Sequence, residues 1–285
     1  MDTIIKIENL EKQYQDFKLD NITFSVPKGC IMGLVGENGA GKSTTINCLL
    51  DLVQKDGGKI TFWEKELSDD PSKLKEDIGV VFDGINFYET LTVKKIEKIS
   101  KSAYKQWDSN IFYRYMKQFS LPIEKEIKTF SKGMKMKLSI AVALSHAPKI
   151  LILDEATSGL DPIMREEILD IFLEFVQNEE HSILMSSHIS TDLEKIADYI
   201  TFIHQGKILF SKSKDELIYK YGVIRCGAAL FDSIDKSEVL AYRKCDYQWE
   251  VLIANKEKAR KKYRGAVVDD ASLDDILLLY VKGEK

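Results

Sequence analysis

The stretch "GLVGENGAGKSTTI", from Gly33 to Ile46, holds the residues of this sequence that are best suited to binding an anion. Its spacing is G-x-x-x-x-G-K-S, and the glycines let main-chain N–H groups approach a phosphate without interference from a Cβ atom. Lys42 is then expected to reach the β- and γ-phosphates, and Ser43 to place its hydroxyl on Mg²⁺. An apolar run, "CIMGLV", precedes the glycines, as a strand-loop-helix phosphate site requires. The pattern predicts a nucleoside triphosphate site.

Two adjacent carboxylates follow a second apolar run. In "ILILDEATSGLDP", Asp154 and Glu155 come at the carboxyl end of an expected buried strand, where open α/β sheets bind their ligands. Asp154 suits the Mg²⁺ shell beside Ser43, and Glu155 can hold a water in line with the γ-phosphate. Such a pair more often caps a helix when it stands alone. Because a phosphate loop lies upstream, the catalytic interpretation is favoured here.

A histidine is expected at the same edge of the sheet. His188 in "LMSSHIS" ends the next strand, and of the four histidines only this one is expected at such a strand end. Its imidazole can therefore act as a donor to the γ-phosphate. A structural role is the alternative, because a lone histidine is more often structural.

A second candidate anion site lies in "FSKGMKMK", from Phe130 to Lys137. Ser131 and Gly133 open an expected helix, whose first N–H groups are free to bind phosphate. Either a second anion binds there, or this half-site closes over a nucleotide that another subunit holds. The spacing leaves both possibilities open, because an N-capping serine needs no ligand.

These residues need an alternating α/β scaffold, and the hydrophobic pattern predicts one. Strand-like runs in the first third are "IIKIENL", "FKLDNITFSV", "CIMGLV" and "GGKITFW". Apolar residues recur at helical spacing over about 92–121, which predicts an all-helical insert, and a further helix is expected over about 132–146. The buried runs "KILILD" and "HSILMSS" flank a helix over 162–176 that Asp161 caps, so a parallel sheet is expected.

The pattern changes near "SKSKDELIYKYG", residues 211–222, which we interpret as a break between two parts of the chain. Beyond it lie short strand-like runs, a basic stretch "KEKARKKYR" and a closing helix in which Ser272 and Asp275 form a capping box. We expect a small accessory subdomain. The basic stretch is interpreted as a solvated helix face, with contact to lipid headgroups as the alternative.

Composition narrows the class of protein. The chain has 285 residues, a net charge of -4 and 30% charged residues, which argues against nucleic acid as the main partner. Its four cysteines show no metal-ligand spacing, so a reduced, cytosolic protein is expected. No signal pattern is visible, and every apolar run is far shorter than the roughly 18 residues that cross a bilayer. If the protein acts at a membrane, another chain must cross it.

Taken in order, the segments "GENGAGKST", "FSKGM", "ILILDEATSGLD" and "SSH" resemble the nucleotide-binding subunit of an ABC transporter, over roughly residues 1–220. The resemblance implies an α/β fold: a P-loop NTPase core with an antiparallel β subdomain and a helical signature subdomain at about 84–146. Residues 221–285 would follow as a small C-terminal α/β accessory subdomain. ATP and Mg²⁺ are the implied cofactors.

The resemblance also implies a role for each motif. Tyr14 would stack on the adenine, and Asp161 would lie in the loop that crosses to a second subunit. Asp154 and Glu155 would be the metal and water residues, and His188 the switch histidine. The phosphate loop would consist of Gly36, Glu37, Asn38, Gly39, Ala40, Gly41, Lys42, Ser43 and Thr44. The signature that closes over the partner's ATP would consist of Ser131, Lys132 and Gly133.

Three positions depart from the family's pattern. Phe130 stands in place of leucine, Lys132 stands where glycine is commonest, and Asp83 replaces a glutamine that links the γ-phosphate and metal to the membrane subunit. A carboxylate cannot act as that neutral amide, but its charge is favourable near Mg²⁺. We therefore predict that Asp83 is a direct or water-mediated metal ligand. The alternative is that Asp83 points into solvent and coupling depends on neighbours such as Tyr88.

The leading interpretation is an ATPase subunit. Two chains, identical or different, would sandwich two MgATP, and hydrolysis would drive a separate integral membrane permease. Asp83, "FSKGMKMKLSIAVALS" and the tail "ASLDDILLLYVKG" are similar to exporters of peptide antibiotics and other amphipathic compounds. The chain would then be cytoplasmic and peripheral, on the inner face of the membrane.

Two other classes are weighed against this interpretation. One is a soluble, non-transport ABC ATPase, and the other is a different P-loop enzyme such as a GTPase or a small-molecule kinase. Tandem cassettes or long coiled coils are typical of the first, and the sequence has neither. An N-K-x-D guanine signal is likewise missing, and "FSKGM" argues against the second class.

Overall fold

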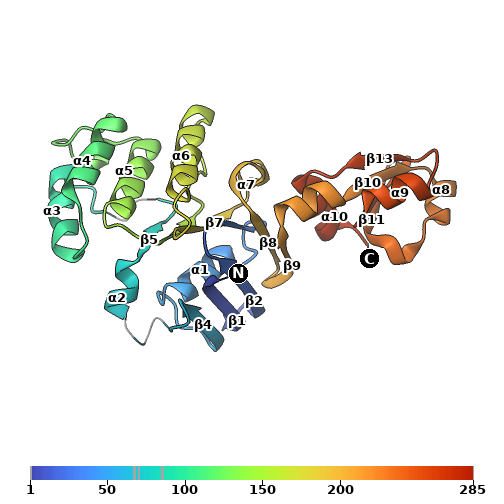
Figure 1. Ribbon diagram of the computed structural model, residues 1–285, viewed down its shortest axis with the longest axis horizontal. Coiled ribbons are helices and arrows are strands. Elements are labelled where there is room, and N and C mark those ends of the chain that lie inside the picture. Colours follow the sequence, from blue (N-terminus) through green and yellow to red (C-terminus); the bar gives the residue numbers. More distant parts are fainter. Residues whose placement is uncertain (1, 67–68, 70, 85–86, 285) are drawn as a thin grey trace.

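The computed structural model describes residues 2–66, 69, 71–84 and 87–284 of the chain. Helices of residues 93–144 lie at one end of an elongated molecule, two sheets lie in the middle, and residues 222–282 lie at the other end (Figure 1). The middle part carries the phosphate loop, the acidic pair and His188, whereas the signature stretch lies with the helices at one end. Its two sheets are therefore described first.

A six-stranded sheet forms the centre of the fold. In spatial order its strands are β5 (Ile78–Val81), β6 (Ile150–Asp154), β7 (Ser182–Ser187), β3 (Ile31–Val35), β8 (Tyr199–His204) and β9 (Lys207–Ser213). The first five run parallel, and β9 pairs antiparallel with β8. The predicted parallel sheet is confirmed. Since both faces of such a sheet are covered, its strands appear in the sequence as continuous apolar runs.

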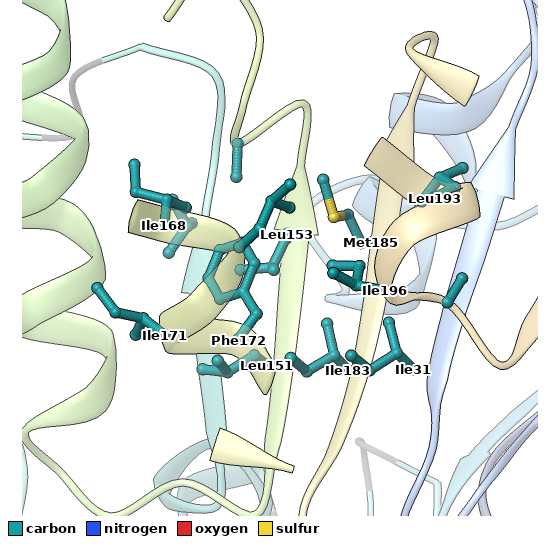
Figure 2. Close-up of a cluster of buried hydrophobic side chains, with 14 of the residues drawn as sticks. Ile31, Leu151, Leu153, Ile168, Ile171, Phe172, Ile183, Met185, Leu193 and Ile196 are labelled. Carbon is teal, nitrogen blue, oxygen red and sulfur yellow. The ribbon is translucent and has the colours of Figure 1, made fainter. Parts of the chain in front are cut away.

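One face of this sheet packs against helices. Leu153 and Met185 share an apolar cluster with Phe172 of α6 (Pro162–Phe175) and Ile196 of α7 (Ser190–Ile196) (Figure 2). The Asp161 side chain accepts a hydrogen bond from the main-chain N–H of Met164 and caps α6, as predicted from the Asp-Pro pair.

The other face packs against α1 (Lys42–Leu49) and a three-stranded antiparallel sheet. The strands of that sheet are, in spatial order, β2 (Lys18–Pro27), β1 (Thr3–Gln13) and β4 (Gly57–Phe62). Ile152 and Leu184 of the central sheet share an apolar cluster with Ile46 of α1. Because side chains alternate along a strand, Asp154, two residues after Ile152, projects toward the same face as α1.

The helical insert is confirmed. Its elements are α3 (Val93–Ala103), α4 (Ser109–Gln118), a 3₁₀ turn η1 (Ile127–Thr129) and α5 (Lys132–Leu144). The short α2 (Pro71–Glu76) lies before the insert, between β4 and β5. Thr92, Asp108 and Ser131 cap α3, α4 and α5 with their side chains. Each of these caps accepts a hydrogen bond from a main-chain N–H of the first turn, which is what Ser, Thr and Asp do at helix starts.

The C-terminal part contains a second antiparallel sheet, with spatial order β11-β12-β10-β13. Its elements are β10 (Gly222–Cys226), α8 (Ala228–Ser233), η3 (Lys236–Glu238), β11 (Val239–Cys245), β12 (Gln248–Ile253), α9 (Lys256–Lys262), β13 (Val267–Asp270) and α10 (Leu273–Lys282). β11 and β13 were not predicted, because β13 has only four residues, two of them aspartates, and β11 lacks a strict alternation of apolar and polar residues. The expected break at 211–222 is only partial, since β9 continues to Ser213 and a π-helical turn, η2 (Glu216–Lys220), joins it to β10.

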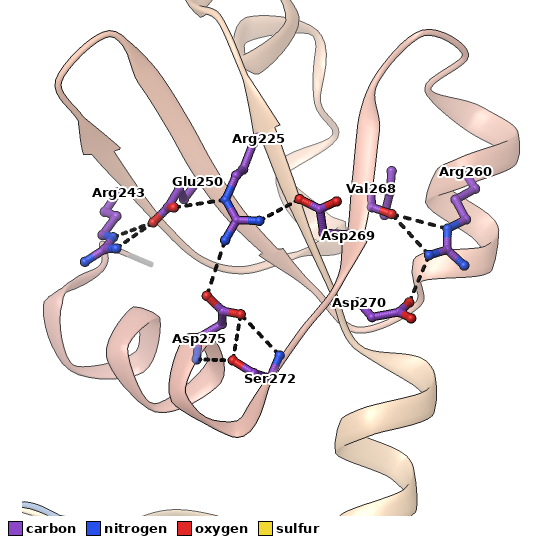
Figure 3. A network of polar contacts seen from close by, with 9 residues as sticks. All are labelled: Arg225, Arg243, Glu250, Arg260, Val268, Asp269, Asp270, Ser272 and Asp275. Atoms are coloured by element: carbon purple, nitrogen blue, oxygen red, sulfur yellow. Dashed lines mark hydrogen bonds and ion pairs between the residues drawn. The ribbon is translucent and has the colours of Figure 1, made fainter. Parts of the chain in front are cut away.

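Arg225 of β10 holds this part together by a polar network (Figure 3). Its guanidinium lies 3.2 Å from Glu250 of β12, 2.6 Å from Asp269 of β13 and 3.3 Å from Asp275 of α10. Asp275 also completes the predicted capping box with Ser272. In addition, Ile276 of α10 belongs to the same apolar cluster as the central sheet, so α10 packs against the core of the molecule.

The basic stretch of α9 is paired rather than free. Lys256 lies 2.7 Å from Asp270, Lys258 lies 2.6 Å from Glu238, and Lys262 lies 3.1 Å from that same Glu238. These carboxylates neutralise much of the positive charge that would otherwise draw the basic stretch to a lipid surface. The structure therefore favours the solvated helix face over lipid contact. Within the ranges given above, no helix has both the length and the apolar character needed to span a membrane.

Candidate nucleotide-binding site

The loop between β3 and α1 has the geometry of a phosphate-binding loop. Gly36 is buried, and a Cβ atom there would lie 2.3 Å from the Ile203 carbonyl oxygen, so a side chain is excluded. Gly39 and Gly41 have φ angles of 81° and 114°, in the left-handed region that glycine adopts without strain. Gly41 is the N-cap of α1 and brings no side chain to its first turn. The N–H groups at the start of α1 are therefore accessible to an anion.

A cleft of about 500 Å³ brings together motifs that are far apart in the sequence. It is lined by Phe17, Asn38, Gly39, Gly41, Lys42, Ser43, Thr44, Asp83, Asp154 and Glu155. Its volume is within the range of about 300–1,000 Å³ that is usual for small-molecule sites. The phosphate loop, the acidic pair and Asp83 thus share one cleft.

Lys42 is at the centre of this cleft although only 5% of it is exposed. Its ammonium donates to the carbonyl oxygens of Gly36, at 2.8 Å, and Glu37, at 3.2 Å. It also pairs with Glu155 Oε1 at 3.1 Å. A buried ammonium with these partners is a fixed positive charge, and a phosphate entering the cleft would compete with Glu155 for it.

Glu155 connects Lys42 to the candidate switch histidine. While its Oε1 faces Lys42, its Oε2 lies 2.6 Å from His188 Nδ1. Glu155 has a φ angle of 54°, which is uncommon for a residue with a Cβ atom. Such conformations persist where the surrounding structure holds them, and they concentrate at functional sites.

Asp154 is almost completely buried at the end of β6. Asp154 and Ser43 both line the cleft, and carboxylate and hydroxyl oxygens are hard donors of the kind that Mg²⁺ selects. Mg²⁺ usually takes one or two carboxylates and completes its shell with waters and phosphate oxygens. The residues present therefore fit Mg²⁺ bound with a nucleotide. In the described ranges no cluster of three or more His, Cys, Asp or Glu residues that could hold a metal ion is found.

Asp83 and Lys132, two of the three departures from the family's pattern, contact each other. Asp83 Oδ1 lies 3.1 Å from Lys132 Nζ, and each side chain is about half exposed. Asp83 also lines a second cleft, of about 310 Å³, with Gly84, Lys132, Lys135 and Met136. It therefore borders both the phosphate loop and the signature, and its carboxylate does not simply point into solvent.

The aromatic residue that lines the cleft is Phe17. Tyr14 is not among the described residues that line the cleft, whereas Phe17 is, three residues further along the β1–β2 turn. A Cβ atom on Gly41 would lie 2.9 Å from the tip of the Phe17 ring, so this ring packs over the end of the phosphate loop. Phe17 was not among the residues predicted from the family's pattern, although it is an aromatic residue in the same turn as Tyr14.

The signature does not reach the phosphate loop of its own chain. Ser131, Gly133 and Asp161 are not among the described residues that line the nucleotide cleft. Ser131 caps α5, with its hydroxyl accepting from Met134 N–H at 3.2 Å. Gly133 is buried where a Cβ atom would lie 2.0 Å from Met164 Sδ, so close packing against α6 already explains this glycine. Ser131 and Gly133 thus lie outside the nucleotide cleft of their own chain.

The expectation that His188 alone ends a strand is wrong. His204 is the last residue of β8, next to β3, and its Nδ1 lies 3.8 Å from Glu37 Oε2 of the phosphate loop. It was missed because "YITFIH" was not recognised as a strand. The Gln205–Gly206 pair, with φ angles of 46° and 72°, is a turn signal that could have revealed the strand end.

The fold and this cleft define a P-loop NTPase of the α/β class. Comparison with known proteins identifies the family. The family model described as ABC transporter matches residues 19–158. The lantibiotic transport ATP-binding protein SrtF of Streptococcus pyogenes is 38% identical over 214 residues, which cover 74% of this chain and 92% of SrtF. The bacitracin transport ATP-binding protein BcrA of Bacillus licheniformis is 35% identical over 212 residues, which cover 73% of this chain and 69% of BcrA.

A solved structure of the ATP-binding subunit of an ABC transporter is also similar to this chain. Its TM-score is 0.67 at 28% identity, over 76% of this chain and 92% of that one. The chain belongs to the ATP-binding proteins of ABC transporters, and it is an ATPase subunit.

Proposed function

We propose that this ATPase powers a separate membrane permease that exports peptide antibiotics or similar amphipathic compounds. The observation that carries the proposal is the cleft in which Lys42, Asp154 and Glu155 meet. Transport of such compounds is supported by the names of SrtF and BcrA, which are a lantibiotic and a bacitracin transport ATP-binding protein. The chain would work at the inner face of the membrane without crossing it.

Residues in and beside the cleft have proposed tasks. The start of α1 and Lys42 hold the phosphates, and the Phe17 ring, rather than Tyr14, packs beside the base. Mg²⁺, held by Ser43 and Asp154, would neutralise charge on the phosphate oxygens. Glu155 orients the attacking water and accepts its proton. His188, which contacts Glu155, keeps that carboxylate in place and can donate to the γ-phosphate.

A second cassette would complete the site. Ser131, Lys132 and Gly133 lie outside the phosphate loop's own binding position, so we propose that they close over the nucleotide of a partner, with Asp161 at the crossing loop. The partner is either a second copy or a related cassette. Residues 221–285 are proposed as an accessory subdomain that packs on the core through α10.

The permease is proposed to dock on an apolar pocket of about 190 Å³. Leu50, Leu52, Ile78, Phe82 and Tyr104 are among its lining residues. Leu52 is 60% exposed, which is unusual for so large an apolar side chain. Phe82 directly precedes Asp83, so a permease segment bound here would respond to changes at the nucleotide.

Leu52→Glu is expected to release the chain from its membrane partner, because a charge would enter the apolar pocket. Purification of tagged chain from detergent-solubilised membranes should recover an integral membrane protein with the wild type and not with this variant. Val267→Glu is the matched control, since Val267 is 62% exposed but lies in the C-terminal sheet. Both variants should keep the ATPase activity of the isolated chain. If the wild type recovers no membrane protein, the soluble, non-transport ABC ATPase becomes the better interpretation.

Asp83 is proposed to contact Mg²⁺ directly or through water, in addition to its pairing with Lys132. In Asp83→Asn the Mg²⁺ concentration that gives half-maximal ATPase activity should then rise severalfold, because a charged oxygen ligand becomes neutral. Lys132→Met separates the two roles: it removes the ion pair and keeps the carboxylate, so it should leave that concentration unchanged or lower it. Equal Mg²⁺ titration curves for the wild type, Asp83→Asn and Asp83→Gln would rule out the metal role.

A further inference from the structure

Ser186 is a buried hydroxyl at the centre of the sheet, directly beside the acidic pair. It lies in β7, between β6 and β3, and in the strand register it is opposite Asp154 on one side and Leu34 on the other. Its relative exposure is 0%. The preceding residues of both strands, Leu153 and Met185, point into the apolar cluster of the opposite face (Figure 2). Ser186 and Asp154 therefore project together toward α1.

The Ser186 hydroxyl uses both of its hydrogen-bonding functions on the acidic pair. It donates to Asp154 Oδ1 at 2.5 Å and accepts from the main-chain N–H of Glu155 at 3.1 Å. The same N–H lies 3.2 Å from the Ser186 carbonyl oxygen. One serine thus contacts the carboxylate of the first acid and the main chain of the second.

These contacts hold two features of the site in place: the main-chain conformation of Glu155 and the orientation of the Asp154 carboxylate. The Glu155 main chain has a positive φ, which a residue with a Cβ atom keeps only when neighbouring groups hold it. The Asp154 carboxylate has two oxygens, and the bond from Ser186 engages Oδ1, which fixes the orientation of the whole group. A buried carboxylate and a buried N–H would each lose a partner if the hydroxyl were removed.

We propose that Ser186 is a positioning residue for ATP hydrolysis: it orients Asp154 toward the metal and holds Glu155 at the angle from which its carboxylate reaches Lys42 and His188. The inference rests on the proposed roles of Asp154 and Glu155. Ser186 touches neither nucleotide nor metal in this role. Substitution of a residue that orients a metal ligand in this way typically lowers metal affinity or activity by about 10- to 100-fold.

The test compares Ser186→Ala with Ser182→Ala. Ser182 lies in the same strand with the same 0% exposure, but its hydroxyl bonds with Gly29 N–H and the Pro27 carbonyl, far from the acids. We expect kcat to fall about 10- to 100-fold in Ser186→Ala and to change little in Ser182→Ala. Mn²⁺ titration of the ATP-loaded chain, followed by electron paramagnetic resonance, should show weaker metal binding in Ser186→Ala alone. ATP affinity in EDTA should be unchanged in both variants.

Ser186→Cys is the second variant, because it keeps a side chain of similar shape and a weak donor. It should fall between the wild type and Ser186→Ala in both kcat and Mn²⁺ affinity. The inference is overturned if Ser186→Ala and Ser182→Ala lose the same activity and thermal stability, or if Mn²⁺ affinity does not change. If Glu155→Gln kept normal turnover, the proposed function itself would fail. If Glu155→Gln were inactive and Ser186→Ala matched its control, only the role of Ser186 would fail.

Discussion

Glu155→Gln is expected to lower ATP turnover at least about a hundredfold while ATP still binds, as for a residue that positions and deprotonates water. This corresponds to at least about 2.7 kcal/mol of barrier. The glutamine side chain has nearly the same shape, so its amide oxygen can still face Lys42 or His188, but it cannot accept a proton from water. ATP affinity should not fall, because the substitution removes a negative charge that pairs with Lys42. Steady-state ATPase assays and equilibrium ATP binding measure the two effects.

Lys42→Ala should give the opposite result and lose ATP binding, because the buried ammonium that faces the phosphate loop is removed. Glu180→Gln is a suitable control for Glu155→Gln, since Glu180 pairs with Lys28 at the surface, outside the cleft. Near-normal turnover in Glu155→Gln would show that the water-positioning role has been assigned to the wrong residue.

Self-association is expected to depend on MgATP, to be strongest in Glu155→Gln and to be abolished when Ser131 in that variant is also changed to arginine. Ser131 and Gly133 do not line the nucleotide cleft of their own chain, so we expect a second chain to enclose the nucleotide. An arginine at the exposed start of α5 would fill the space that the partner's phosphates need. Light scattering at saturating MgATP distinguishes monomer from dimer.

Changing Ser131 to arginine also removes the N-cap of α5. The control therefore has to remove a helix cap and add an arginine elsewhere in the chain. Asn255→Arg removes the side-chain cap of α9 and adds the same charge at an exposed position in the C-terminal part. It should leave ATP-dependent dimerisation intact. A monomeric Glu155→Gln chain under saturating MgATP would contradict a homodimer, and the same experiment would then be repeated with a second cassette.

Much of the fold could be predicted because its signals are local. The glycine spacing of the phosphate loop, the caps at Asp161 and Ser272, and the apolar runs of β3, β6 and β7 each depend on residues that are neighbours in the sequence. The same reasoning failed where local signals are weak. β13 is four residues long with two aspartates, and β11 lacks a strict alternation of apolar and polar residues; each pairs with a neighbouring strand, β10 or β12.

The sequence by itself determined that this is a phosphate-binding α/β protein of the ABC transporter ATP-binding family, because strand-loop-helix patterns and motif order are properties of the chain. Only the tertiary structure decided which charges meet. Asp83 pairs with Lys132, and Glu155 lies between Lys42 and His188, because sheet order and helix packing bring these side chains together. Ser186 contacts both acids only because β7 pairs with β6 in one particular register. A shift of one residue would turn its hydroxyl to the other face of the sheet, and no local pattern in the sequence specifies that register.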